Sequence, residues 1–250
     1  MKIVNGSKAR IPDMKELWLE AFPEDSEFVD VFFRDLYKPS KTLLRYDGKT
    51  LASMLFWFDV KIKYKKRVFK GAYLYGVATR LSERHAGHFT ALHSHFTELL
   101  KSKKYKFIAT LPANDRLFSF YKRLGYTLSF RKTEYTHSSL DFNEISSEEA
   151  WERHLADYQK SKASIKLLES REMFLESTRN HHFLGFDGGY FAFYKSGSRY
   201  IMYDVCDPEN TAPSHELTHY EKSAVLLDLD QSFDPDLWDK EKPILNFMMN

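Results

Sequence analysis

The sequence contains few of the residues that mark specialised protein classes. Of its 250 residues one is a cysteine, Cys206, which excludes an internal disulfide framework and a cysteine-rich zinc site. Lysine and arginine number 37 and the acidic residues 35, so bulk charge does not favour a nucleic-acid partner. Apolar runs stay far below the roughly 20 residues of a membrane-spanning helix, and the first residues contain no apolar signal region. We therefore expect a cytoplasmic protein with no nucleic-acid or membrane partner.

Hydrophobic residues, by contrast, are plentiful. They make up 43% of the chain, and aromatic residues alone make up 16%. A chain of this length buries enough surface for one large domain or two small ones. So many aromatic side chains favour bulky hydrophobic cores over a site for a flat ligand. The sequence predicts no particular oligomeric state.

The first half of the chain mixes helical and extended patterns. Apolar residues at helical spacing predict helices, and runs of apolar and aromatic residues predict strands. Asp47-Gly48 is a strong hairpin signal. The segment 61–69 alternates apolar residues with lysines, as in a half-exposed strand or a loop. The predicted helices span 13–22, 26–36, 89–100 and 115–124, and the predicted strands span 42–46, 51–60, 71–79, 107–111 and 126–136.

A polar, acidic stretch at 138–149 indicates a boundary, and the second half follows it. Both halves place helices before strands, which is consistent with a weak internal duplication. The predicted helices of this half span 148–159 and 164–178, the predicted strands span 189–195, 200–204, 223–229 and 243–250, and 207–214 is a predicted loop.

The segment from 73 to 100 carries a pattern with chemical meaning. A strand enters a loop that contains Arg84-x-x-Gly87, and the loop opens an amphipathic helix. The start of a helix presents unpaired backbone N–H groups and the positive end of the helix dipole. Together with a glycine that allows close approach, this arrangement is typical of a phosphate site. The simpler interpretation of the loop alone is a surface turn with a helix-capping glycine.

A second motif follows in the chain, Pro112-x-Asn114-x-x-Leu117-x-x-Phe120-Tyr121-x-x-x-Gly125-Tyr126. In this order and spacing, the two motifs resemble the GNAT superfamily of acyl-CoA N-acyltransferases. In that family Arg/Gln-x-x-Gly-x-Gly/Ala binds the CoA pyrophosphate, and the Asn…Tyr-x-x-x-Gly-Phe/Tyr helix holds the pantetheine arm and the general acid. The resemblance is good over 71–126 and looser over the rest of 1–137.

At two places the sequence departs from the family pattern, and one of these departures points to a particular branch of the family. Phe89 stands where the family usually has glycine or alanine, and His85-Ala86 replaces a glycine and a basic residue. A bulky residue at that place is similar to the enhanced-intracellular-survival branch, which pairs a GNAT domain with a second GNAT-like region. The resemblance therefore implies an α/β (α+β) fold. A GNAT-like mixed, twisted sheet flanked by helices is expected at 1–137, and a smaller, incomplete GNAT-like lobe at 138–250.

The same resemblance implies transfer of an acetyl group from acetyl-CoA, as co-substrate and without a metal, to a primary amine of a small molecule or peptide. It makes Tyr121 the acid that protonates the leaving thiolate. In the resembling branch the terminal α-carboxylate acts as base, which here would be that of Asn250; an exposed carboxylate on a sheet-edge strand is the simpler alternative. The implied CoA-binding residues are Val77, Ala78, Thr79, Arg84, His85, Gly87, His88, Phe89, Thr90 and Asn114.

Two rival functions stay open. Phe89 and the missing basic residue at 86 favour a degenerate GNAT domain that binds acyl-CoA or a protein partner without turnover. Aminoacyl transfer from tRNA by a related two-lobed fold is disfavoured by the near-neutral charge.

The remaining candidates have simpler explanations. His85, His88, His93 and His95 lack the spacing of a zinc motif and are expected on a solvated helix face. The pairs His181-His182 and His215/His219 are interpreted in the same way. The lysines of 61–70 indicate a solvated strand edge, and Cys206 is expected to be a small core residue. Asp25, Glu27 and Glu83 are candidate bases, but capping and surface roles are commoner.

Overall fold

A computed structural model describes residues 1–136, 143–161, 165–179, 181–186, 188–196, 199–206 and 216–243. The chain divides into two compact units, and the division is not a single cut in the sequence. The first unit consists of Met1–Phe58 and Ala72–Lys106, and the second of Asp59–Gly71 and Phe107–Asn250. The predicted boundary at 137/138 separates two regions by family resemblance, and it stays a prediction.

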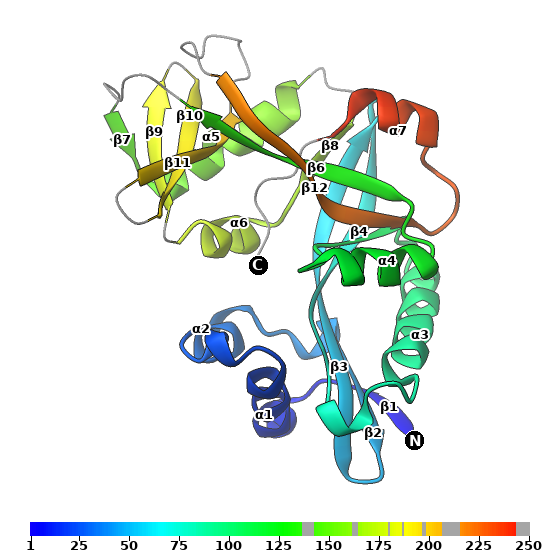
Figure 1. Ribbon diagram of the computed structural model, residues 1–250. Helices are drawn as coiled ribbons and strands as arrows, with labels where there is room; N and C mark the ends of the chain where they lie inside the picture. Colours follow the sequence, from blue (N-terminus) through cyan, green and yellow to red (C-terminus); the bar gives the residue numbers. More distant parts are fainter. Residues whose placement is uncertain are drawn as a thin grey trace. The chain divides into compact units, whose positions relative to one another are not determined.

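The first unit is a sheet with helices (Figure 1). Its strands follow the order β1-β2-β3-β4, and β1 and β2, like β2 and β3, pair in antiparallel fashion. Asp47 and Thr50 close the β2–β3 hairpin, as the Asp47-Gly48 signal predicts. The elements are β1 (Lys2–Asn5), α1 (Ile11–Ala21), α2 (Phe28–Val31) with a π-helical turn (Phe32–Leu36), β2 (Thr42–Asp47), β3 (Thr50–Tyr64), β4 (Arg67–Thr79) and α3 (His88–Ser102).

The core of the first unit is aromatic. The Trp18 ring lies 4.6 Å from the Phe32 ring, 5.5 Å from that of Phe56 and 5.8 Å from that of Tyr75, measured between centroids. These rings join α1 and the end of α2 to β3 and β4. Gly76 lies beneath them, where a Cβ atom would come within 2.8 Å of Phe56. The aromatic residues therefore build a core, as their abundance predicts.

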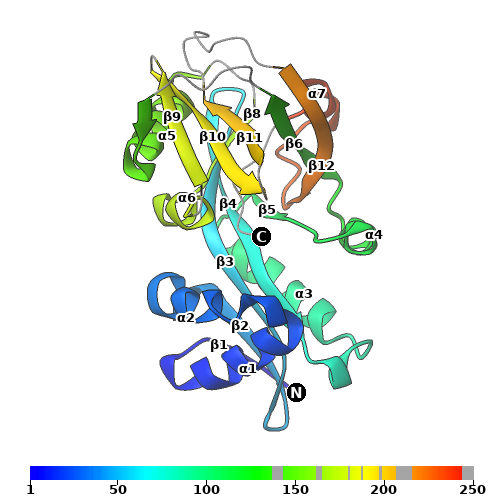
Figure 2. The same cartoon turned by 60° about the vertical axis from the view of Figure 1, so that its left-hand side comes forward.

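The second unit contains most of the strands (Figure 2). They follow the order β5-β12-β6-β11-β10-β9-β7, so the last described strand lies between two earlier ones. The described pairings among them are antiparallel. The elements are β5 (Phe107–Thr110), α4 (Asp115–Arg123), β6 (Leu128–Thr136), β7 (Asn143–Ile145), α5 (Ser147–Lys160), β8 (Ile165–Leu168), α6 (Arg171–Ser177), β9 (His181–Phe186), β10 (Gly189–Ser196), β11 (Arg199–Cys206), β12 (Glu216–Asp228) and α7 (Pro235–Glu241).

The lysine-rich segment 61–69 forms the end of β3, a two-residue turn and the start of β4. Lys65 and Lys66 make the turn, with φ of 47° and 66°, the left-handed values of a tight hairpin turn. Lys63 is less solvated than expected, because its Nζ donates to the carbonyl oxygens of Tyr158, Gln159 and Ser161 at the end of α5. A lysine at this place also interacts favourably with the helix dipole.

The predicted helix at 164–178 is wrong in its first part. Ile165–Leu168 is β8, which pairs in antiparallel fashion with the Lys61–Tyr64 part of β3. A long-range partner decides the conformation of this short apolar run, and spacing alone does not reveal that partner. Only Arg171–Ser177 is helical, and it begins at Ser170, whose hydroxyl accepts a hydrogen bond from Met173 N.

Helices α5 and α6 cover a separate core in the second unit. Trp151, Phe174, Phe183 and Tyr190 are its large side chains, and Cys206 is 3% exposed among them. The expectation that Cys206 is a small core residue is therefore confirmed. The terminal strand expected at 243–250 falls almost wholly on residues 244–250, outside the described residues.

Candidate functional site

The site that the sequence predicts begins in the first unit, at the end of β4. Gly76 lies within this strand and has φ of +54°, a left-handed value that glycine adopts without a steric penalty. Beyond it, Ser53 Oγ donates to Ala78 O at 2.9 Å and lies 3.0 Å from Thr79 Oγ1. This bond helps to hold the backbone of Val77–Thr79, the predicted pantetheine segment.

The loop after β4 is anchored to α1. The Arg80 guanidinium donates to Glu16 and Glu20, in both cases at 2.9 Å, and to Leu51 O at 3.2 Å. Glu20 also accepts from Leu81 N at 2.6 Å. These bonds hold the first residues of the loop before it reaches the predicted phosphate motif.

Helix α3 begins without a capping side chain. Gly87 is its N-cap with φ of +75°, and no side chain of the described residues accepts a bond from the first turn there. The first helical bond runs from Ala91 N to Gly87 O, so the N–H groups of His88, Phe89 and Thr90 have no acceptor within the helix. Apart from Gly87 itself and its neighbours along the chain, no described atom lies within 4 Å of the place of a Gly87 Cβ. The backbone is therefore open to an anion at the positive end of a 15-residue helix.

The side chains of this loop leave room for such an anion. Arg84 is exposed, and its Nε donates to Thr79 O at 3.3 Å, which leaves its two terminal nitrogens available as donors. His85 and Thr90 are also exposed. Phe89 is half-buried, with its ring 5.6 Å from that of His93 along the helix. The residues present therefore fit a CoA pyrophosphate, even though Phe89 replaces a small residue.

Two of the four histidines near α3 are not on a solvated face, so that expectation is wrong for them. His88 and His93 are buried, whereas His85 and His95 are exposed. The buried stripe of α3 consists of His88, Leu92, His93, Phe96 and Leu100, while Phe89 and Leu99 are only half-buried. Burial lowers the pKa of His93 to about 4, so this side chain is neutral at pH 7.

His88 lies between an acidic and a basic side chain. Arg45 Nε donates to His88 Nδ1 at 3.1 Å, and His88 Nε2 lies 3.0 Å from Glu83 Oε2. Asp47, Glu83 and His88 also bring ligand atoms within 4.8 Å of one another, which is close enough for a metal ion. However, the Arg45 donor requires Nδ1 to accept, so Nε2 carries the proton and donates to Glu83. This tautomer leaves His88 without a lone pair for a cation, and the trio is a poor metal site.

The predicted general acid belongs to the second unit. Tyr121 is 5% exposed, and burial raises its pKa to about 12. Tyr126 is buried as well, and its ring lies 5.1 Å from that of Tyr121. Burial also raises the pKa of Tyr126. Because both phenols are enclosed, exposure does not distinguish them, and the role of Tyr121 stays a prediction.

Asn114 stands at the start of α4. Its Oδ1 accepts from Leu117 N at 3.1 Å, so the side chain caps this helix. The cap leaves the amide nitrogen as a donor, and Asn114 is exposed. A CoA contact from Asn114 therefore stays a prediction. The other predicted catalytic group, the carboxylate of Asn250, lies outside the described residues.

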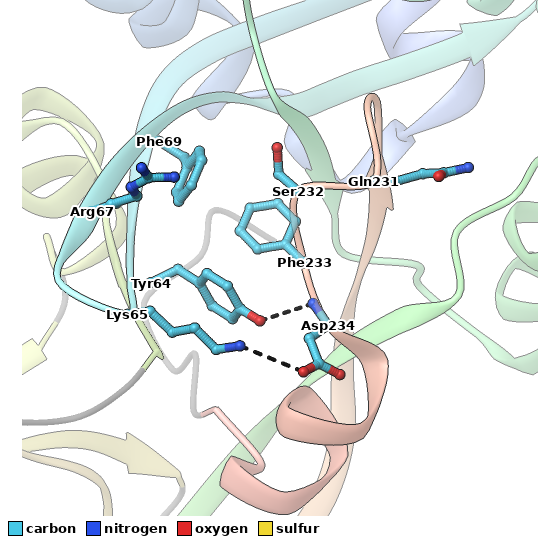
Figure 3. Close-up of a pocket in the computed structure, with 8 residues that line it drawn as sticks. All are labelled: Tyr64, Lys65, Arg67, Phe69, Gln231, Ser232, Phe233 and Asp234. Carbon is cyan, nitrogen blue, oxygen red and sulfur yellow. Dashed lines mark hydrogen bonds and ion pairs between the residues drawn. The ribbon is translucent and has the colours of Figure 1, made fainter.

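The second unit also has a surface pocket of about 430 Å³ beside the β3–β4 turn (Figure 3). Its floor is a triangle of rings from Tyr64, Phe69 and Phe233, with centroids 5.2 to 6.2 Å apart. Tyr64 Oη accepts from Asp234 N at 2.8 Å, and Lys65 Nζ lies 3.5 Å from Asp234 Oδ2. Because Tyr64 and Phe233 are almost fully buried, little apolar surface is left for a ligand. We interpret the contacts that line this pocket as structural, because they join the β3–β4 hairpin to the loop before α7.

Within the described part of the chain, no helix combines the length and hydropathy needed to cross a membrane.

Comparisons with known proteins place the chain in a family. The model of the acetyltransferase (GNAT) domain matches residues 2–129. No curated protein sequence matches the chain significantly. Solved structures with a similar fold include GCN5-related N-acetyltransferases from Anabaena variabilis (TM-score 0.71, 12% identity, 92% of this chain and 73% of that one) and Kribbella flavida (0.67, 13%, 90% and 70%). Eis1 from Mycobacterium abscessus is also similar (0.68, 10%, 92% and 74%).

These likenesses confirm the expected fold, a mixed α/β structure with a large sheet flanked by helices and a second, smaller lobe. At such identities the structures show the fold alone, whereas the family model rests on the sequence itself. The matched residues 2–129 contain both the Arg84-x-x-Gly87 motif and the Asn114…Tyr121 helix, and they make up more than half of the chain. The protein therefore belongs to the GNAT acetyltransferase family.

Proposed function

We propose that this protein transfers an acetyl group from acetyl-CoA to a primary amine of a small molecule or peptide. Family membership supports acyl transfer from an acyl-CoA in general. The observation that carries the more specific proposal is the beginning of α3, where Gly87 leaves the backbone open and no described side chain caps the helix.

The pyrophosphate of CoA is expected at this open end. The N–H groups of His88, Phe89 and Thr90 are donors without a helical acceptor, and the terminal nitrogens of Arg84 add a fixed positive charge. The pantetheine arm is expected along Val77–Thr79, directly after Gly76 with its φ of +54°. Backbone N–H groups at the end of this strand are proposed to stabilise the oxyanion.

The chemistry then requires two proton movements. The ammonium of the acceptor, with a pKa near 10, loses a proton, and the free amine attacks the thioester carbonyl carbon. The C–S bond breaks as the C–N bond forms, and the CoA thiolate leaves. We propose that Tyr121 donates to the leaving sulfur, and a base accepts the amine proton.

The raised pKa of Tyr121 defines what it contributes. With a pKa of about 12 the phenol keeps its proton at every working pH. A thiol resembling that of cysteine has a pKa of about 8.5, so complete transfer from phenol to thiolate is uphill. Tyr121 is therefore proposed to stabilise the developing thiolate through a hydrogen bond, and solvent supplies the final proton.

A second candidate is a domain that binds acyl-CoA without turnover. The exposed Ala86 and the half-buried Phe89 favour it, because a basic and a small residue are absent from the loop that would hold the phosphates.

Two measurements separate these functions. Calorimetric titration with acetyl-CoA tests binding, and a thiol-release assay over a panel of primary amines tests turnover. Binding together with amine-dependent release supports the transferase, and binding without release for every amine supports the second candidate. A protein that binds neither acetyl-CoA nor CoA contradicts both.

A further inference from the structure

The loop between β4 and α3 is closed from within by a bond between side chains. His88 Nε2 lies 3.0 Å from Glu83 Oε2, across the residues 84–87 that are expected to surround the pyrophosphate. We infer that this Glu83–His88 clamp positions the loop for the CoA phosphates, so that both are positioning residues for the co-substrate. The inference rests on the proposed function, because it names how the same site is kept in shape.

The clamp is itself held in place. His88 is the first residue of α3 and its side chain is 1% exposed, while Glu83 ends the short 3-10 turn Leu81–Glu83. From β2, Arg45 Nε donates to His88 Nδ1 at 3.1 Å. This donor fixes the imidazole tautomer and directs the remaining N–H toward Glu83. The loop is thus tied at both of its ends to one buried ring.

Such a tie is needed because the loop has a strained backbone. His85 has φ of 68° and Gly87 has φ of 75°, with Ala86 between them. The left-handed region is unfavourable for a side chain such as histidine, and it persists where the surroundings over-determine it. The clamp spans both residues, and the only other described side-chain bond within 84–87 is that from Arg84 to Thr79 O.

The clamp also holds the negatively charged carboxylate of Glu83 away from the first backbone N–H groups of α3. Acidic side chains just before a helix commonly accept hydrogen bonds from its first N–H groups. Glu83 lies five residues before His88, and a released carboxylate there would compete with phosphate for the open donors of α3. The bond from His88 occupies Glu83 instead. The second acid nearby, Asp47, lies on β2 and is exposed.

Two substitutions of His88 separate the clamp from simple packing. In His88→Asn the amide oxygen takes the place of Nδ1, so the bond with Arg45 is kept and the bond with Glu83 is lost. In His88→Gln the amide nitrogen takes the place of Nε2, so the bond with Glu83 is restored. His95→Asn, at an exposed position of the same helix, is the matched control.

The experiment measures CoA and pantetheine affinity by calorimetry for the wild type and the three variants, and hydrogen exchange of the amides 84–87 without ligand. Pantetheine lacks the pyrophosphate, so it reports on the rest of the site. For His88→Asn we expect about tenfold weaker CoA binding, the equivalent of one lost hydrogen bond to a charged group, and faster exchange. His88→Gln recovers most of the loss, and pantetheine affinity stays constant throughout.

The outcomes decide between the claims. The inference is overturned if His88→Asn binds CoA like the wild type. It is also overturned if His88→Gln is as weak as His88→Asn, or if pantetheine weakens in parallel, because each result points to packing alone. A wild type that binds no CoA overturns the proposed function, and the inference with it.

Discussion

Helices α3 and α4 each begin after a strand and a loop, but their first turns differ in N-terminal capping. Helix α3 starts at Gly87, and no described side chain caps it. Helix α4 starts at Asn114, whose side chain accepts from Leu117 N. A side-chain cap satisfies an N–H group of the first turn and places a side chain over it, which leaves less of the backbone open to a ligand. The comparison teaches that α3 offers its backbone to a ligand, whereas α4 contributes side chains.

Further helices of the second unit agree with α4. Ser146, Ser170 and Asp234 cap α5, α6 and α7 through their side chains. In the first unit, α1 and α2 also lack a side-chain cap, so α3 is distinguished by its Gly87 N-cap, with φ of +75°, and not by the missing cap alone. If it serves CoA, changes at α3 will alter binding, and changes at α4 will alter chemistry or stability.

The largest effect is expected from Tyr121→Phe, which tests the chemical role of α4. Loss of the phenol should lower kcat about hundredfold while CoA affinity stays constant. Because burial raises the pKa of Tyr121 to about 12, the phenol is protonated from about pH 6 to about pH 10. The ratio of wild-type to variant rates is therefore expected to stay flat over that range.

Tyr126→Phe is the control for this measurement, since Tyr126 is equally buried and lies beside Tyr121. It should keep nearly full activity with an accepted amine. If Tyr121→Phe retains more than about a third of the wild-type rate, well above the loss typical of a general acid, Tyr121 does not act on the sulfur.

Arg84→Ala tests the ligand side of the comparison. A charge-assisted bond to phosphate contributes about 2 kcal/mol, so CoA affinity should fall roughly thirtyfold in calorimetry. Arg116→Ala removes an equally exposed guanidinium from the first turn of α4 and should change little. Equal losses in the two variants would mean that bulk charge, rather than the α3 site, attracts CoA.

Two glycines with positive φ sharpen the contrast at the backbone. Gly87 has φ of 75° and open space around it, whereas Gly125, just after α4, has φ of 93° and Leu227 Cδ1 3.2 Å from the place of its Cβ. Alanine at either position costs about 1 kcal/mol of backbone strain. Only Gly87→Ala should also weaken CoA, by about tenfold, because its methyl group occupies the closest approach to the phosphates. Thermal unfolding measures the effect on stability, and calorimetry measures the effect on CoA affinity. If Gly125→Ala also weakened CoA binding, the two glycines would not differ in their relation to the ligand.

Local patterns were sufficient for much of this site. The apolar spacing of α3, the Gly87 signal and the helix that follows Asn114 all lie within short stretches of sequence, so the sequence predicts them. The sequence did not predict the turn at Lys65–Lys66, because this turn uses two lysines where glycine or asparagine is usual. The sequence did not predict strand β8, because its partner, the Lys61–Tyr64 part of β3, is distant in sequence.

The Glu83–His88 clamp was missed for a related reason. Arg45 and His88 are 43 positions apart, and no spacing rule connects them. The predicted stripe of α3 placed Phe89 inside and His88 on a solvated face, although the structure buries His88. A histidine whose two ring nitrogens both have partners packs as a core residue, and the local sequence does not distinguish it from an exposed one.

The smallest effect is expected at Asn114, whose side chain caps α4 and is also predicted to contact CoA. Asn114→Ala removes the cap and should cost about 1 kcal/mol of stability in chemical unfolding. Asn114→Asp keeps the accepting oxygen, so its stability should stay near that of the wild type, but it loses the amide donor predicted for the pantetheine arm. One neutral hydrogen bond of about 1 kcal/mol corresponds to roughly fivefold weaker CoA binding. Ser146→Asp exchanges the cap of α5 in the same way and should leave CoA affinity unchanged, because that helix belongs to the second lobe. If Asn114→Asp binds CoA as tightly as the wild type, the amide holds no ligand, and Asn114 is a cap like those of α5, α6 and α7.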